Sequence, residues 1–374
     1  MTILQRVRLF FTHLYCLGHK ELLAILKDPR MRIALIMPVF TQGLLFGYVA
    51  NYNLDSVPYA VVDTSRSEAS QSLIAHFDGS PAFSRTATLA VPAEIEPLIN
   101  SETILMALII PADFEARLAR GETAPVEVIT DGRNALTSTL ATGYAAAIIA
   151  RWNAERLHAA PAITLTSRTW YNENQITRWT FLPSIIAMIS FVQVIMLAGL
   201  SIAREREQGT FDQLLVTPLA PVEILIGKAL PPMLIGLVQS TLLLLISLFW
   251  FEIPFAGSFL TLYLTLFLFI LSSTGIGLCV SAVARSMQQV LVYLFVLLMP
   301  LALLSGIATP VANMPRILQI LTYVDPLRFA VEAVRRVYLE GAVAADLIGD
   351  YIPLLLISAF TLPLAMRLFR SRAI

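Results

Sequence analysis

Six long stretches of this sequence contain no Asp, Glu, Lys or Arg. They are Ile33–Leu54, Trp179–Ala203, Ala229–Phe251, Ile253–Ala284, Ser286–Pro315 and Tyr351–Met366. About 20 apolar residues in a helix cross the hydrocarbon core of a bilayer. Only 14% of the residues are charged, well below the quarter that is usual in soluble domains. The sequence therefore predicts an α-helical integral membrane protein with six transmembrane helices, at 31–54 for the first and within 179–374 for the other five. The last stretch is short, but Arg367 can reach water from a helix end.

The distribution of Lys and Arg predicts which ends face the cytoplasm. Lys and Arg are concentrated in the short cytoplasmic segments of membrane proteins. With six spans, both termini, the second-to-third loop and the turn at Arg285 lie on one side. That side carries Arg6, Arg8, Lys20, Lys27, Arg30, Arg32, Arg204, Arg206, Lys228, Arg285, Arg367, Arg370 and Arg372. The other side, outside residues 55–178, carries Arg316, Arg328, Arg335 and Arg336. We expect both termini in the cytoplasm.

Residues 55–178 differ in composition from the rest and hold 14 of the 26 acidic residues. Short apolar runs at Tyr59–Val62, Phe83–Leu89, Ile104–Ile110 and Val126–Ile129 are typical of strands. Helical patterns separate them at Ser67–Phe77, Pro92–Asn100 and Ala112–Arg120, and a longer helix is expected at 135–158. The pattern predicts an inserted extracytoplasmic α/β domain.

Residues 1–30 form an amphipathic pattern before the first span. Apolar residues fall near one helical face, and most of the basic residues lie elsewhere. This favours a cytoplasmic helix in contact with the membrane lipids. A basic flank with no role beyond orientation remains an alternative.

The second cytoplasmic loop, residues 204–228, predicts a short helix between two membrane helices. Alternating charges at Arg204, Glu205, Arg206 and Glu207 would carry the second span into water. Gly209 permits a turn, and Thr210 with Gln213 matches a capping box. The helix that follows has an apolar side and ends before a proline; the residues concerned are Phe211, Leu214, Leu215 and Pro218. Such an element can dock a cytoplasmic partner or rest on lipid head groups.

The same loop resembles a known family. Arg204-Glu205-Arg206-Glu207-Gln208-Gly209-Thr210, then Leu214-Leu215-Val216-Thr217-Pro218, is similar to the loop of type-2 ABC exporter permeases. Within that family the chain resembles bacterial drug-efflux-like half-permeases, which carry a large extracytoplasmic domain after the first span. Supporting motifs are Val62-Asp63-Thr64-Ser65, Asp131-Gly132-Arg133-Asn134, Ala284-Arg285-Ser286, Leu304-Ser305-Gly306 and Met314-Pro315. Trp170-Tyr171-Asn172-Glu173 departs from the family, in which proline usually follows the asparagine.

The resemblance implies the permease subunit of an ATP-driven exporter in the bacterial inner membrane, moving a hydrophobic or amphiphilic cargo. It implies that the loop contacts separate ABC ATPase subunits, that ATP and Mg²⁺ are bound by that partner, and that two half-permeases form a homodimer or heterodimer. A periplasmic adaptor is a further implied partner. The sequence contains no Gly-x4-Gly-Lys-Ser/Thr motif, so we expect no ATPase site in this chain. Its balance of 26 basic and 26 acidic residues gives no indication of nucleic-acid binding.

Other chemistry finds little support in the sequence. The four histidines form no pair at metal-ligand spacing, and neither a disulfide framework nor a metal cluster is expected from the two cysteines. Several polar residues in or beside the spans are candidates to line a transport path: Gln193, Gln239, Ser273, Gln288 and Gln289. Residues of this kind also bridge packed helices, and the sequence favours that alternative. Residues 310–349 combine charges with apolar residues and predict a re-entrant or interfacial outer helix that ends at Gly341.

Two other classes of protein are less consistent with the sequence. A membrane sensor or receptor that binds a ligand through the extracytoplasmic domain would need a cytoplasmic output domain, and the inner segments are short. A membrane enzyme would need a polar catalytic set, which the spans lack. The exporter remains the first hypothesis.

Overall fold

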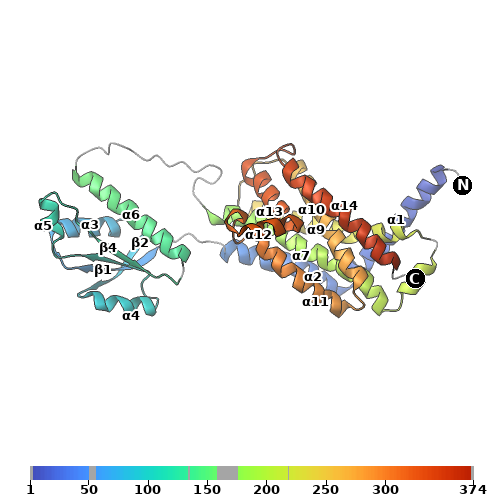
Figure 1. Ribbon diagram of the computed structural model, residues 1–374, viewed down its shortest axis with the longest axis horizontal. Coiled ribbons are helices and arrows are strands. Elements are labelled where there is room, and N and C mark those ends of the chain that lie inside the picture. The colour runs from blue at the N-terminus through green and yellow to red at the C-terminus, as the bar shows by residue number, and fades with distance from the viewer. Residues whose placement is uncertain (1–2, 50–55, 134, 158–175, 218, 372–374) are drawn as a thin grey trace. The chain divides into compact units, whose positions relative to one another are not determined.

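A computed structural model describes residues 3–49, 56–133, 135–157, 176–217 and 219–371, and within them all side chains except those of 3–7, 30, 135–136, 212 and 214–215. The chain divides into two compact units. We call Met1–Asn51 with Thr169–Ile374 the helical unit, and Tyr52–Arg168 the sheet unit. Figure 1 shows the helices and strands of each.

The sheet unit contains four strands in the order β2-β1-β3-β4. β1, β2 and β3 are parallel, and the edge strand β4 pairs antiparallel with β3. The strands are β1 (Val57–Asp63), β2 (Phe83–Leu89), β3 (Met106–Ile110) and β4 (Glu127–Thr130). The helices are α3 (Glu68–Asp78), the 3₁₀ turn η1 (Pro92–Glu94) with α4 (Ile95–Asn100), α5 (Phe114–Ala119) and α6 (Ala135–Leu157). These elements confirm the predicted order of strands and helices, with boundaries within about two residues.

Alternation along β1 supplies both faces of the sheet. Val57, Tyr59 and Val61 pack under α3, α5 and α6, where Trp152 of α6 is also buried. The intervening Ala60 and Val62 pack against α4 on the opposite face. Because successive side chains of a strand point to opposite faces, one buried strand serves two apolar layers. The sheet unit is therefore a three-layer α/β fold with a core of its own (Figure 1).

The described residues of the helical unit are almost entirely helical, and six of their helices are long and apolar enough to cross a membrane. Its elements are α1 (Ile3–Lys27), α2 (Pro29–Val49), α7 (Thr177–Glu207), α8 (Phe211–Val216), α9 (Pro221–Leu245) with the π-helical turn η2 (Ile246–Trp250), α10 (Phe259–Val283), α11 (Met287–Leu304), η3 (Val311–Asn313), α12 (Arg316–Leu321), η4 (Thr322–Val324), α13 (Pro326–Arg335) with the π-helical turn η5 (Arg336–Glu340), and α14 (Ile348–Ser371). The candidate spans lie in α2, α7, α9–η2, α10, α11 and α14. Within the described residues, the six predicted spans are confirmed as helices that are long and apolar enough to cross a membrane.

Several predicted spans need corrected ends. The third begins at Pro221 rather than Ala229, and the fourth begins at Phe259 rather than Ile253. The fifth stops at Leu304 rather than Pro315, because the chain turns at Ser305–Gly306, where Gly306 has φ +86°. The sixth begins at Ile348 rather than Tyr351 and runs to Ser371. It includes Asp350, whose carboxylate lies 3.4 Å from Arg336, so a charge excluded by the sequence criterion is paired within the protein. The predicted end of the first span, residues 50–54, lies outside the described residues.

α7 lies at the centre of the helical unit and packs against α2, α9, α10, α11 and α13, while α10 also packs against α14. The α7–α10 contact is close. A Cβ added at Gly277 would lie 2.7 Å from the Cβ of Ala198 and 2.8 Å from the carbonyl oxygen of Ile195. This agrees with the small residues at Ser272–Gly277, which permit close helix approach. Helix α7 is thus fixed on most of its surface.

The segment predicted at 310–349 contains a helix, α13, that packs against α7, α10 and α14. Its apolar face is buried, and Gly341 ends the following turn at φ +71°, as predicted. Asp325 caps the N-terminus of α13, with Oδ1 accepting from the Leu327 N–H at 2.9 Å. Where this helix lies in a bilayer stays a prediction.

Candidate functional site

The C-terminal turns of α7 extend beyond its apolar part. α7 has 31 residues and is about 46 Å long at 1.5 Å per residue, whereas the hydrocarbon core is about 30 Å thick. After α7 the chain reverses at Gly209, which has φ +70°, and continues into α8. α9 begins at Pro221, with Glu223 accepting from the Ala220 N–H at 2.8 Å. The short helix predicted between two membrane helices is therefore present as α8.

A cluster of charged side chains lies between α1, α7 and α9. Lys228 of α9 has no exposed side-chain surface. Its Nζ lies 3.0 Å from Oε2 of Glu205 and 3.2 Å from Oε1 of Glu21, and it donates to the Ser201 carbonyl at 3.3 Å. Lys20 adds a longer contact of 3.8 Å to Glu205. Lys20, Glu21, Glu205 and Lys228 are called the Lys228 cluster below.

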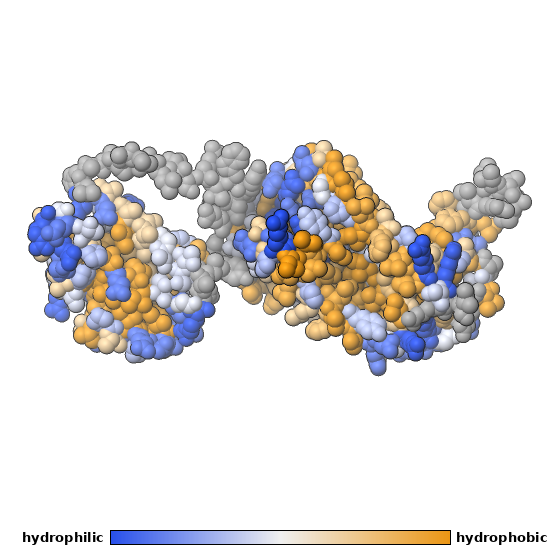
Figure 2. Space-filling model, viewed as in Figure 1, coloured by the Kyte–Doolittle hydropathy of each residue, from blue (hydrophilic) through white to orange (hydrophobic). Residues whose placement is uncertain are grey.

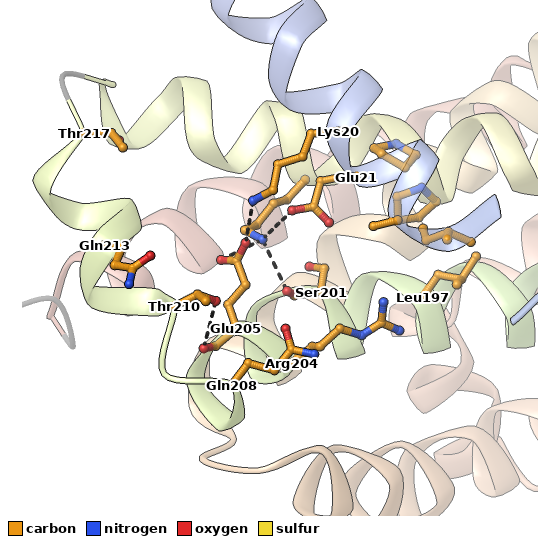
Figure 3. A pocket seen from close by; sticks show the side chains of 15 residues that line it. Lys20, Glu21, Leu197, Ser201, Arg204, Glu205, Gln208, Thr210, Gln213 and Thr217 are labelled. Carbon is orange, nitrogen blue, oxygen red and sulfur yellow. Dashed lines mark hydrogen bonds and ion pairs between the residues drawn. The ribbon is translucent and has the colours of Figure 1, made fainter. Parts of the chain in front are cut away.

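The Lys228 cluster lines a cavity of about 400 Å³. Figure 3 shows Lys20 and Glu21 of α1 and Glu205 of α7 directed into it. Thr210, Gln213 and Thr217, which precede, belong to and follow α8, line the same cavity. Glu21 and Glu205 both face the buried Lys228, and Lys20, at the protein surface, brings a second positive charge to Glu205. Removing Lys228 would leave the largely buried Glu205 without its nearest partner. The cluster therefore holds α1, α7 and α9 together next to α8.

Arg206 and Phe211 fix α8 to the rest of the helical unit. The Arg206 guanidinium lies 4.8 Å from the centre of the Phe211 ring and donates to the carbonyls of Ala282 and Ala284 at 3.2 and 3.0 Å. Phe211 is buried and contacts Phe369 of α14 edge to face. The expectation that Phe211 belongs to an exposed apolar face is therefore wrong, because its ring points into the core of the unit.

Other residues of the loop also have inward contacts. The expectation that Glu205 lies in water is also wrong, because its side chain is buried and pairs with Lys228. Glu207 accepts from the Met287 N–H at 2.9 Å, and the Thr210 hydroxyl donates to the Glu205 carbonyl at 3.4 Å. Arg204 lines the cavity. The side chains of Leu214 and Leu215, and all of Pro218, lie outside the described residues, so their part in an apolar face stays a prediction.

The five candidate pathway residues are not brought together. Gln193 and Gln239 are buried and donate to the carbonyls of Ala34 and Leu35 in α2 at 3.3 and 2.8 Å. Pro38 has no N–H to bond Ala34, four residues earlier, so Gln193 satisfies a carbonyl that the proline leaves free. Ser273 donates to the Phe269 carbonyl of its own helix.

The other two candidates, Gln288 and Gln289, are exposed in the first turn of α11. Gln289 accepts from the Arg285 N–H at 2.9 Å. The geometry favours the bridging alternative for Gln193 and Gln239, and a pathway role for any of the five remains untested.

The comparisons with known proteins decide the family. The family model "ABC-2 family transporter protein" matches residues 29–367. The chain belongs to this family. It is 38% identical over 366 residues to the "Probable multidrug ABC transporter permease YbhR" of Escherichia coli, covering 97% of this chain and 99% of that protein. Identity is 30% to the "Probable multidrug ABC transporter permease YbhS" of E. coli (88% and 89% covered), and 23% to the "Linearmycin resistance permease protein LnrN" of Bacillus subtilis (94% and 97% covered).

Membership of the ABC-2 transporter family confirms the resemblance seen in the sequence. The protein is the permease subunit of an ABC-type exporter and a multi-pass membrane protein. The amphipathic α1 lies entirely before the matched residues, yet it supplies Lys20 and Glu21 to the Lys228 cluster. In this ABC-2 transporter the N-terminal helix is thus part of the candidate site.

The sequence did not indicate Glu21, and it indicated Lys228 only as one of the basic residues of the cytoplasmic side, at the end of the loop 204–228. One signal was available: Lys228 stands where the long apolar part of α9 begins, and a lysine there needs an acidic partner or a route to water. The partner could not be identified, because Glu21 is 207 residues away in the chain. His13 and Glu223 form a second α1–α9 contact at 3.3 Å that no local motif predicts.

Proposed function

We propose that the protein works as a half-permease whose end bearing α8 docks a separate ABC ATPase subunit in the cytoplasm. The observation that supports this most is the Lys228 cluster, because it ties α1, α7 and α9 into one rigid group beside α8. A force applied to α8 would be transmitted to α7, which contacts most of the other spans. Buried ion pairs resist separation, since breaking one leaves an unpaired charge.

The orientation belongs to the same proposal. Both termini lie in the cytoplasm of a bacterial cell, and the sheet unit lies outside the inner membrane, as the distribution of Lys and Arg indicates. In a chain without Cys16 and Cys279, an impermeant thiol reagent added to intact cells with a permeable outer membrane should label a cysteine introduced at Ser80. Labelling only after the inner membrane is broken would show the opposite orientation and contradict the proposal.

Partners and cargo follow from the family and the sequence. The permease pairs with a second half-permease, the same chain or a related one, and ATP and Mg²⁺ are bound by the ATPase. A periplasmic adaptor is a further partner, and bilayer lipids surround the spans. The cargo is a hydrophobic or amphiphilic compound, in keeping with relatives named as multidrug and linearmycin resistance permeases. The chain itself carries no phosphate-binding Gly-x4-Gly-Lys-Ser/Thr motif.

The function is tested by changing α8 and measuring the ATPase that co-purifies. Replacing Leu214 and Leu215 by Asp places two charges on α8, which should cost several kcal/mol at a docking surface and release the ATPase. The control is Val91→Asp, which adds a charge at an exposed valine of the sheet unit. ATPase recovery and cargo export are compared at equal membrane abundance. If the double variant keeps its ATPase and exports normally, α8 is only a connector.

A further inference from the structure

A second cavity, of about 510 Å³, lies at the opposite end of the helical unit. α11 starts beside Glu207, whose carboxylate accepts from the Met287 N–H, and ends at Leu304 next to this cavity. Residues of η3, α12, α13 and η5 complete the lining. The length of α11 therefore separates this outer cavity from the Lys228 cluster. The outer cavity is not part of the candidate site described above.

Two arginines of α13, Arg328 and Arg335, line the outer cavity, and neither forms an ion pair with an acidic side chain among the described residues. Arg328 donates to Thr322 Oγ1 and to the Gln319 carbonyl, and its guanidinium lies 4.5 Å from the centre of the Tyr323 ring. Arg335 donates through Nη2 to Ser184 Oγ at 2.9 Å. The Nε atoms of both are buried and have no hydrogen-bond partner among the described residues. Each guanidinium is therefore incompletely hydrogen-bonded within the described residues.

The neighbouring Arg336 shows the contrast. It lies 3.4 Å from Asp350 and 3.5 Å from Glu340, so its charge is matched within the protein. Among the residues that the structure describes, Arg328 and Arg335 have no carboxylate within 4.0 Å. A guanidinium that is held by neutral groups and lacks a counter-ion is suited to accept one from a ligand. Phosphate and carboxylate are the groups that match its geometry.

The three charged residues of this face follow a helical stripe. Arg328, Glu332 and Arg335 are spaced i, i+4 and i+7, so they line one side of α13 over two turns. Glu332 is exposed and has no ion pair among the described residues. Its carboxylate weakens the positive field between the two arginines without cancelling it by contact. Removing that charge should therefore strengthen the attraction for an anion.

Apolar surface borders the cavity. Ile317 and Ile320 of α12 and Val324 of η4 are 75%, 64% and 70% exposed. Where α12 and α13 lie, Figure 2 shows strongly hydrophilic and strongly hydrophobic residues side by side. An ionic head group and an apolar tail would each find matching surface at this place.

We propose that the outer cavity binds the anionic head group, a phosphate or a carboxylate, of an amphiphile. Arg328 and Arg335 donate to the head group, and the apolar part lies along the exposed side of α12. The proposal adds to the proposed export function the charge of the bound amphiphile, which is negative. The role of the outer cavity in transport rests on that proposed function. Binding itself requires neither an ATPase nor transport, so its failure is distinguishable from a failure of the export proposal.

The test is equilibrium binding to the full chain in an uncharged detergent, followed by native mass spectrometry. The probes are dioctanoyl phosphatidic acid and laurate, and dioctanoylglycerol is the uncharged control. We expect at least one anionic probe to bind about tenfold or more tightly than the control, since a charge-assisted hydrogen bond is worth about one decade in affinity. Preference for phosphatidic acid identifies a phosphate-headed lipid as the occupant, and preference for laurate identifies a carboxylate.

Variants separate the site from general attraction to a basic protein. Arg328→Gln and Arg335→Gln should each weaken binding of the preferred probe about tenfold. Arg316→Gln removes the same charge from an exposed position of α12 outside the cavity lining and should leave binding unchanged. Glu332→Gln should tighten binding about two- to fivefold, a gain that misfolding cannot produce. Equal binding of all three probes, or unchanged affinity in Arg328→Gln, Arg335→Gln and Glu332→Gln, overturns the proposal.

Discussion

At the scale of single residues, charged side chains that are buried between helices need a partner that compensates their charge. Lys228 is fully buried and lies between two carboxylates, whereas Asp325 caps α13 with one oxygen and has no hydrogen-bond partner for the other among the described residues. The first is stabilised by opposite charge and the second only in part. The two groups therefore respond differently to substitution.

Removing Lys228 should destabilise the helical unit more than removing the whole ion pair. Lys228→Met leaves Glu205 buried without its 3.0 Å partner and should cost about 3–5 kcal/mol. Lys228→Met combined with Glu205→Gln removes both charges and should be closer to wild type, because no unpaired carboxylate of that pair remains. The thermal midpoints of the detergent-solubilised variants measure this. If the double variant is as unstable as the sum of the two single variants, the pair does not act as a unit.

Asp325 predicts a stability that falls as pH rises. Burial raises the pKa of its carboxyl from the ordinary 3.8 to about 7. The folded protein therefore holds a proton more tightly than the unfolded chain between about pH 4 and 7, and stability decreases with pH through that window by at most about 1.4 kcal/mol per pH unit. Asp325→Asn keeps the helix cap and removes the titration. Thermal midpoints at pH 5 and pH 8 should differ less in the variant, and an equal fall in both would refute the assignment.

At the scale of elements, hydrophobic pattern and turn residues were sufficient for most of the fold. The charge-free runs located all six candidate spans, and the short apolar run at Tyr59–Val62 located a strand that is buried on both faces. Two of the missed span boundaries have identifiable reasons. The fifth span ends early because the chain turns at Ser305–Gly306 inside an apolar run. The sixth span starts before Asp350, because this carboxylate is neutralised by Arg336, and no pattern in the sequence shows that the two side chains meet.

Gly209 sets the direction of α8. It has φ +70°, and an added Cβ would meet no atom within 4 Å, so a side chain is opposed by backbone strain rather than by contact. Gly209→Val should misdirect α8 and reduce ATPase recovery, because β-branched residues disfavour this conformation. Gly209→Asn is the matched control, since asparagine adopts positive φ more readily. Both are measured at equal membrane abundance. Equal loss of the ATPase in the two variants would show that the backbone conformation is not the cause.

At the scale of the whole molecule, the candidate site could be predicted only where it is local in sequence. The loop motif identified residues 204–218 and, with them, the family. It could not show that Phe211 and Glu205 turn inward, because their partners Phe369 and Lys228 come from other helices. The outer cavity could not be predicted for the same reason, because Arg335 donates a hydrogen bond to Ser184, which is 151 residues away in the chain. Contacts of that range are formed by the packing of the helices and leave no periodic pattern in the chain.

The central claim is that the α8 end of this permease meets an ABC ATPase in the cytoplasm. A photo-activated cross-linking residue at Val216, which is 86% exposed at the end of α8, tests it directly. After irradiation of intact cells, the account predicts a cross-linked polypeptide that carries a phosphate-binding Gly-x4-Gly-Lys-Ser/Thr motif, identified by mass spectrometry. The same residue at Val91 of the sheet unit should give no such product. An ATPase adduct at Val91, or none at Val216 in membranes that export the cargo, would contradict the account.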